Sequence, residues 1–191
     1  MSSYAAQPII PHQINLDAVA GALTPSGPTL VRKLSDLSGC FEDTATFDAE
    51  VAASNPIVYQ VVSSTVPEVP RELPQSITTI YAGHVSGELY MTKGHQHPDP
   101  QGEIYFGLSG VGGIIMFDGK ESKYVEITPG KIGYIPPGWA HRSINTGNEP
   151  YKFLAVYPGS AGHDYGWVLK NGMGLRGYMT NGKLDLREFK I

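Results

Sequence analysis

The sequence predicts a single-domain, all-β protein folded as a barrel or sandwich. Its 191 residues, 41% of them hydrophobic, suffice for one compact core. Short runs of β-forming residues follow one another from Ile57 onward, and Gly, Pro, Asn and Asp separate them. The 23 glycines and 15 prolines supply much of this punctuation and favour a turn-rich β fold.

Residues 1–40 are expected to form an N-terminal extended arm, and residues 41–191 the barrel with its flanking strands. Prolines such as Pro25 and Pro28 interrupt the arm, and its apolar residues show little periodicity. The sequence contains no internal repeat, low-complexity tract or second domain. The prediction is therefore one folded unit preceded by an extension.

A short helix is expected at the beginning of the second part. Asp43 or Thr44 can cap its first turn, because either side chain accepts a hydrogen bond from a free backbone N–H. Phe47 and Val51 are four positions apart and share one face of the helix. Asn55 stands before a proline, which ends the helix.

The expected strands are short and closely spaced. They correspond to residues 57–64, 76–85, 87–95, 103–110, 112–119, 122–130, 131–137, 141–147 and 151–158. Asp118 and Gly119 are expected to form a tight type I′ hairpin turn, since Asp-Gly readily takes positive φ values. Residues 182–191 are expected to add an outer strand.

The composition excludes several classes of partner. The net charge is −4, from 14 basic and 18 acidic residues without a basic cluster, so neither nucleic acid nor an anionic membrane surface is an expected partner. No stretch approaches the ~20 apolar residues of a membrane span. The single cysteine, Cys40, cannot form an internal disulfide, which favours a reducing compartment and a cytoplasmic location.

Several chemistry-bearing residues gather in the stretch YMTKGHQHPDPQGEIYFG. His95 and His97 are two positions apart, which on a strand places both imidazoles on one face. Glu103 follows a Pro/Gly-rich turn that can return its carboxylate to the two histidines. His141 follows a Pro-Pro-Gly turn further along the chain and can supply a fourth ligand. The competing interpretation of the histidine pair alone is an exposed polar turn.

Three imidazoles and one carboxylate suit a borderline divalent ion, with positions left for substrate or water. Fe²⁺, Mn²⁺, Ni²⁺, Co²⁺ and Zn²⁺ all meet this description. Lone histidines such as His12 and His84 are expected to have no such role. The sequence has no phosphate loop of the Gly-x-x-x-x-Gly-Lys type, so nucleotide binding is not expected.

Two segments resemble the two cupin motifs in order and separation. Residues 95–110 read His-x-His, five residues, Glu, six residues and Gly. Residues 130–145 read Gly, five residues, Pro-x-Gly, two residues, His, three residues and Asn. The second segment matches position by position, whereas the first has a longer spacing before Glu103 than is usual in cupins. The resemblance implies a cupin barrel (a double-stranded β-helix or jelly roll) with an N-terminal extension and one or more short helices.

A narrower resemblance is to the cupin-type glucose-6-phosphate isomerases first known from archaea. It runs from Val31 to Gly166, and its most specific part is YPGSAGHDYG, residues 157–166, which generic cupins lack. It implies a metal-dependent aldose–ketose isomerase that interconverts glucose 6-phosphate and fructose 6-phosphate. It also implies one divalent ion per subunit, iron foremost, held by His95, His97, Glu103 and His141.

The same resemblance implies the residues of a sugar-phosphate pocket. It gives catalytic roles to Glu103, His163 and Tyr165. The residues implied to bind substrate are Tyr59, Thr78, Thr92, Gly94, Tyr105 and Tyr157. The alternative for Tyr59 and Tyr157 is a ring buried in the barrel wall. Aldose–ketose isomerisation needs a base beside C1 and C2 and donors for the oxygens, and Glu103 is a candidate for the base.

Other functions remain open at this point. They are an isomerase acting on mannose 6-phosphate, an iron or nickel oxygenase, a manganese decarboxylase, and a non-catalytic cupin that binds a sugar. The segment from His163 to Tyr165 favours the isomerase over an oxygenase, whose pocket would be more apolar. The intact ligand set argues against a pure binding module. A homodimer is expected, because most barrels of this class pair through outer strands.

Overall fold

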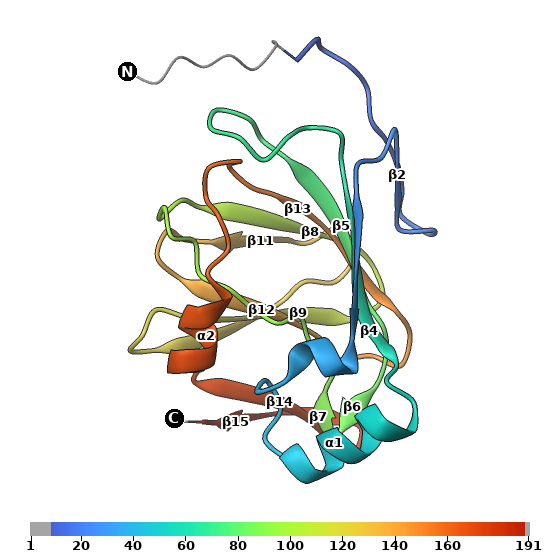
Figure 1. The fold of residues 1–191 in the computed structure, drawn as a ribbon, viewed down its shortest axis with the longest axis vertical. Helices are drawn as coiled ribbons and strands as arrows, with labels where there is room; N and C mark the ends of the chain where they lie inside the picture. Colours follow the sequence, from blue (N-terminus) through green and yellow to red (C-terminus); the bar gives the residue numbers. More distant parts are fainter. Residues whose placement is uncertain (1–8, 190–191) are drawn as a thin grey trace.

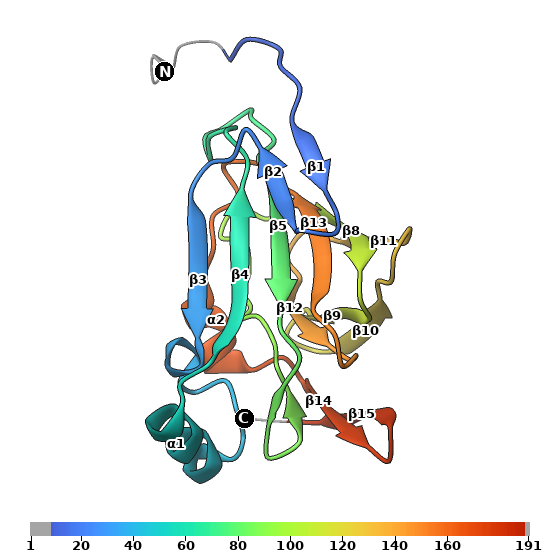
Figure 2. The same cartoon turned by 90° about the vertical axis from the view of Figure 1, so that its right-hand side faces the viewer.

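The barrel is built from two antiparallel sheets. The computed structural model describes residues 9–189 (Figure 1). The larger sheet contains, in spatial order, β11 (Ile132–Ile135), β8 (Glu103–Ser109), β13 (Tyr151–Val156), β5 (Gln75–Ile80), β4 (Ile57–Ser63) and β3 (Thr29–Lys33). The smaller contains β10 (Ser122–Glu126), β9 (Gly112–Phe117) and β12 (Ala140–Asn145). Figure 2 shows the larger sheet toward the viewer, with β9 and β12 behind it.

The apolar core fills the space between the two sheets. Ile80 and Phe153 project into it from the larger sheet, and Ile114 and Met116 from the smaller. All four side chains are buried. Alternate residues of a strand point to opposite faces, so each strand offers one apolar face to this core. The predicted all-β, single-domain cupin barrel is confirmed.

A third sheet closes one end of the barrel. It contains β15 (Lys183–Glu188), β14 (Leu175–Thr180), β7 (Glu88–Leu89) and β6 (His84–Val85). The outer strand expected within residues 182–191 is β15, which is therefore confirmed over the described residues. Its partner β14 was not predicted from the sequence.

A type I′ hairpin turn is present, but it joins β6 to β7 and not β9 to β10 as predicted. β6 and β7 are joined by Ser86 and Gly87, whose φ angles are 48° and 86°, as a type I′ turn requires. The hairpin between β9 and β10 exists, but its type I′ turn was predicted wrongly. Only Gly119 in that loop has a positive φ, and the Asp118 carboxylate instead accepts hydrogen bonds from the backbone N–H groups of Lys120 and Glu121.

Two helices flank the barrel in Figure 1, α1 (Thr44–Ala53) and α2 (Tyr165–Asn171). The first is the predicted helix, and the Asp43 side chain caps it by accepting from the backbone N–H of Thr46 at 2.9 Å. The second was not predicted individually. Asp164 caps it in the same way, accepting from the backbone N–H of Trp167 at 3.0 Å. Among the described residues, no helix is long and apolar enough to cross a membrane.

The N-terminal segment is tied to the barrel. It contains the hairpin of β1 (Asn15–Asp17) and β2 (Ala22–Thr24), and then β3 and the 3-10 turn η1 (Leu34–Leu37). The Lys152 ammonium donates to the carbonyl of Val19 at 2.6 Å, and β3 pairs with β4. Part of the predicted arm therefore belongs to the larger sheet, and the boundary at residue 40 stays a prediction.

Candidate metal centre and its cavity

The two segments that carry the histidines are joined by backbone pairing. The N–H of His95 donates to the carbonyl of His141 at 3.1 Å, and the N–H of His141 donates back to His95 at 2.9 Å. β12 thus holds His141 against the segment that contains His95 and His97. Glu103 enters from the larger sheet as the first residue of β8. Three separate parts of the chain therefore converge on one point.

The four predicted ligands form a compact group. One ligand atom from each of them lies within 4.8 Å of the others. The Glu103 carboxylate oxygen Oε2 is central, at 3.1 Å from His97 Nε2 and 3.0 Å from His141 Nε2. The rings of His95 and His97 stack with centroids 5.1 Å apart, so the two imidazoles share one face as the i, i+2 spacing predicts.

The donor set fits a divalent metal ion. The Nε2 atom of His95 is buried and has no hydrogen-bond partner in the described part of the chain, so its lone pair is available to a ligand-seeking cation. His141 Nδ1 lies 3.3 Å from the carbonyl of Trp139. We assign the ring proton to that nitrogen, which directs the Nε2 lone pair toward Glu103. The lone pairs of His141 Nε2 and the Glu103 carboxylate face each other at 3.0 Å, and a cation between the two atoms would stabilise this arrangement.

The protonation of the group also suits a cation. Burial, reinforced by the neighbouring His141 and other imidazoles, lowers the pKa of His95 well below its usual value, so the ring is neutral at neutral pH. Burial alone would raise the pKa of Glu103, but the neighbouring imidazoles of His141 and His97 lower it overall. The carboxylate is therefore ionised. A negative carboxylate beside the neutral imidazole of His95 has the electronic character of a metal site.

A cavity of about 270 Å³ opens beside this group. Among the residues that line it are three metal-ligand candidates, His95, Glu103 and His141, whereas His97 is not at the cavity surface. The lining also includes every residue implied by resemblance to bind substrate or take part in catalysis, namely Tyr59, Thr78, Thr92, Gly94, Tyr105, Tyr157, His163 and Tyr165. The structure brings these residues together, and their individual roles stay predictions.

The tyrosines of the cavity keep their protons. Burial raises the pKa of Tyr59 to about 12 and that of Tyr105 well above its usual value. Their hydroxyl groups are therefore neutral at physiological pH and can donate hydrogen bonds. Tyr59 and Tyr105 are each less than one-tenth exposed, so they also serve as barrel-wall aromatics. The two interpretations of Tyr59 are compatible.

His163 and Tyr165 face the metal group from the segment that leads into α2. The ring of His163 lies 4.4 Å from that of His95, centroid to centroid, and stacks on Tyr165 at 6.2 Å. Burial lowers the pKa of His163, so its imidazole is neutral at neutral pH. A neutral imidazole can both accept and donate a proton, which suits acid–base work beside a substrate.

Sequence reasoning missed Glu68, which lines the same cavity from the loop between β4 and β5. The hydroxyl of Tyr157 donates to its carboxylate at 2.6 Å. Burial, together with this carboxylate, raises the pKa of Tyr157. The Tyr157 oxygen is thereby left as a hydrogen-bond acceptor toward the cavity. No local motif marks Glu68, because only the path of the loop brings it to the cavity.

Gly94 precedes His95 with a backbone conformation that other residues rarely adopt. Its φ is 77°, and a Cβ atom there would lie 3.1 Å from Arg142 Cβ and 3.2 Å from the carbonyl oxygen of His141. A side chain at this position would push apart the two segments that carry metal ligands. Glycine is therefore required for both the turn and the close approach.

Gly94→Ala is expected to lower the free energy of unfolding by about 1–3 kcal/mol and to weaken metal binding. The control is Gly182→Ala, because Gly182 has a similar φ of 73° but nothing within 4 Å of its Cβ position. Urea unfolding of metal-free protein and a metal titration of each variant provide the measurement. Equal metal affinity in the two variants would contradict the steric argument.

Known proteins resemble this chain over most of its length. A family model described as glucose-6-phosphate isomerase matches residues 31–190. The glucose-6-phosphate isomerase of Thermococcus kodakarensis is 41% identical over 164 residues, which cover 85% of this chain and 86% of that protein. The one from Thermococcus litoralis is 38% identical over 180 residues, covering 93% and 94%. Among solved structures, Bacillus subtilis oxalate decarboxylase gives a TM-score of 0.41 at 21% identity, over 52% of this chain and 26% of that chain.

Proposed function

The chain belongs to the glucose-6-phosphate isomerase family, and from this premise we propose that it interconverts glucose 6-phosphate and fructose 6-phosphate. The observation that carries the proposal is the placement of the metal-ligand group beside a cavity lined by hydroxyl groups and a neutral imidazole. Membership of the family at about 40% identity over most of the chain points to the same reaction.

We propose that His95, His97, Glu103 and His141 hold one divalent ion per chain, with Fe²⁺ the first candidate and Mn²⁺, Ni²⁺, Co²⁺ and Zn²⁺ the others. A bound divalent ion would act as a Lewis acid that polarises the oxygens on C1 and C2 of the sugar. Nitrogen and carboxylate ligands suit all of these metals, so the donor set alone does not choose among them.

Two groups of the chain are proposed to handle protons. Glu103 is ionised and lies at the cavity surface, so it is proposed to carry a proton between C2 and C1. His163, neutral and with its ring 4.4 Å from that of His95, centroid to centroid, is proposed to exchange a proton with the ring oxygen of the sugar. Tyr165, stacked on His163, is proposed to hold that imidazole in position.

The remaining cavity residues are proposed to bind the sugar phosphate. Thr92 Oγ1 accepts from the backbone N–H of Ser143 at 3.0 Å, which leaves its own hydroxyl hydrogen free to donate to a phosphate oxygen. Gly94 and Thr78 are proposed to contact the phosphate group as well. The remaining proposed substrate-binding residues, placed against the sugar hydroxyls, are Tyr59, Tyr105 and Tyr157.

Thr92→Val is expected to raise KM for glucose 6-phosphate by about 10-fold or more, since it removes a donor to a charged group. It is also expected to destabilise the protein, because the Ser143 N–H loses its acceptor. Thr92→Ser keeps the hydroxyl and is the control for both effects. Steady-state kinetics and thermal unfolding separate them, and an unchanged KM in Thr92→Val would show that Thr92 does not bind the phosphate.

Membership of the family favours the isomerase over the oxygenase, the decarboxylase and the non-catalytic binder. The decisive experiment is an isomerase assay on purified protein, with glucose 6-phosphate, mannose 6-phosphate and unphosphorylated glucose as substrates. Elemental analysis of the same preparation gives the metal. Glucose 6-phosphate is expected to be turned over far more efficiently than glucose. Absence of turnover in a preparation with full metal occupancy would refute the proposal.

The predicted homodimer and cytoplasmic location are proposals as well. β3 is an edge strand of the larger sheet, and its Leu30 and Val31 are 39% and 43% exposed. An unpaired, apolar strand edge favours pairing with a second copy. We expect sedimentation equilibrium to give twice the chain mass, and Val31→Lys, which charges this edge, to shift the protein toward monomer. A native protein that sediments as a monomer would contradict the proposal.

A further inference from the structure

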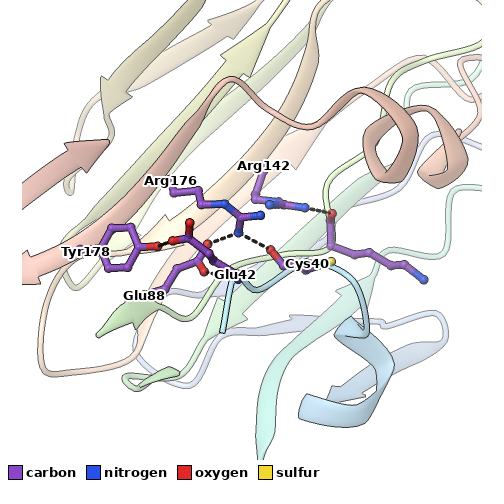
Figure 3. Close-up of polar contacts among 7 residues, drawn as sticks. Cys40, Glu42, Glu88, Arg142, Arg176 and Tyr178 are labelled. Carbon is purple, nitrogen blue, oxygen red and sulfur yellow. Dashed lines mark hydrogen bonds and ion pairs between the residues drawn. The ribbon is translucent and has the colours of Figure 1, made fainter. Parts of the chain in front are cut away.

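A small cavity lies behind the metal centre, on the side of β12 away from the sugar-phosphate cavity. It measures about 30 Å³, and α2, the segment around Cys40, the beginning of β14 and Phe189 line it. Two arginines line it, Arg142 from β12 and Arg176 from β14. Figure 3 shows these two side chains with the polar groups that surround them.

The carboxylates near this cavity are already engaged. Glu88 is almost fully buried and pairs with Arg176 Nη1 at 2.6 Å, while its other oxygen accepts from the backbone N–H of Glu42 at 2.9 Å. Arg176 Nη1 also donates to the carbonyl of Cys40 at 2.8 Å. The carboxylate of Glu42, an exposed residue, accepts from the hydroxyl of Tyr178 (Figure 3).

Arg142 has no such partner in the described part of the chain. Only 6% of the residue is exposed, and its guanidinium makes a single hydrogen bond, from Nη2 to the carbonyl of Lys93 at 2.9 Å. Its Nε is buried without an acceptor, and so is the Nε of Arg176. An unpaired buried charge is strongly destabilising. Of the two arginines, Arg176 contacts a carboxylate, whereas the guanidinium of Arg142 has no carboxylate in contact with it in the described residues.

We infer that the cavity binds a monatomic anion, chloride in the first place, between Arg142 and Arg176. An anion offers an acceptor to the free guanidinium donors and a contacting counter-charge to Arg142, which a water molecule cannot do together. The volume accommodates about one or two water-sized particles, which suits a monatomic anion.

The position of the site connects it to the metal centre. Arg142 follows His141 directly in β12, and its side chain packs against Gly94. α2 lies over the anion cavity with Val168 and Leu169, and its first residue, Tyr165, lines the sugar-phosphate cavity. An anion held here fixes both the strand and the helix that support the candidate active site. This inference rests on contacts of Arg142 and Arg176 and does not depend on the proposed isomerase activity.

Crystals of the metal-loaded native protein grown in sodium bromide provide the direct test. One strong anomalous peak at the bromide edge is expected in the cavity, within hydrogen-bond distance of both guanidinium groups. A water molecule or a protein carboxylate in that position would overturn the inference. This measurement needs no variant, so it holds even if changes at Arg142 prevent folding.

Thermal unfolding of the metal-loaded protein gives the second test. Chloride replaces gluconate at constant ionic strength, and Tm is expected to rise by about 2–4 °C in a saturable manner. Arg142→Gln is expected to lose this response. Lys131→Gln, which removes a positive charge from an exposed ion pair with Glu126, is expected to keep it. An identical chloride response in both variants would assign the effect to another part of the protein.

Discussion

Removal of the divalent metal is expected to abolish isomerase activity, and one ion per chain is expected to restore it. The physical reason is that four buried donors, three imidazoles and one carboxylate, share the same space and need a cation to stabilise their lone pairs. Dialysis against a chelator, followed by titration with each candidate metal, gives both the activity and the stoichiometry. Full activity in a preparation shown by elemental analysis to be metal-free would sink this prediction.

His141→Ala tests the same site by removing one of the four proposed metal ligands. It is expected to weaken metal binding by more than about 100-fold. This exceeds the effect of losing a residue that only hydrogen-bonds to a metal ligand. The barrel should still fold, because the core between the sheets is apolar and does not depend on the metal group. His84→Ala removes an exposed histidine from β6 and is the matched control, with unchanged metal affinity. Circular dichroism of both metal-free variants checks the fold.

Glu103→Gln is expected to lower kcat by at least about 100-fold once metal occupancy is restored. The amide keeps the shape of the side chain but removes its charge and basicity. As a ligand, Glu103 shares its charge with the cation and becomes a weaker base, and as a base it must still reach the hydrogen on C2. Glu126→Gln, which removes an exposed carboxylate, is the control and should leave kcat unchanged.

Isotope tracing separates the two roles of Glu103. If its carboxylate carries the proton through a cis-enediol, substrate deuterated at C2 loses part of its label to ordinary water during turnover. Complete retention of deuterium at C1 of the product would instead indicate a direct hydride shift from C2 to C1. Glu103 would then be a ligand only, and the loss of kcat in Glu103→Gln would have to be explained by a weakened metal site.

Motifs and local caps predicted a large part of the fold and the site. Asp43 marks the start of α1, and the spacing of His95, His97, Glu103 and His141 is sufficient to predict a shared metal group. α2 was missed although Asp164 caps it in the same way as Asp43 caps α1. Its short length and its glycine give no helical period to detect.

The errors have a common physical cause. Residues 76–85 were predicted as one strand, but β5 ends at Ile80 and the chain turns into the separate β6–β7 hairpin. β-propensity is high on both sides of that break, and only tertiary pairing decides where a strand stops. Glu68 was missed for a related reason, since its place at the cavity depends on the path of a loop. Single-residue roles in such loops are decided by tertiary structure.

The reciprocal backbone pairing of His95 with His141 has a consequence for the order of folding. These residues are far apart in the chain, so no metal site exists until the sheets have closed around the core. Metal uptake should therefore follow barrel closure and leave the refolding rate of the chain unchanged. Stopped-flow refolding with and without the ion measures this, and a rate that increases with metal concentration would mean that the ligands assemble early. In the expected case, the folded metal-free protein is an obligatory intermediate in the formation of the active enzyme.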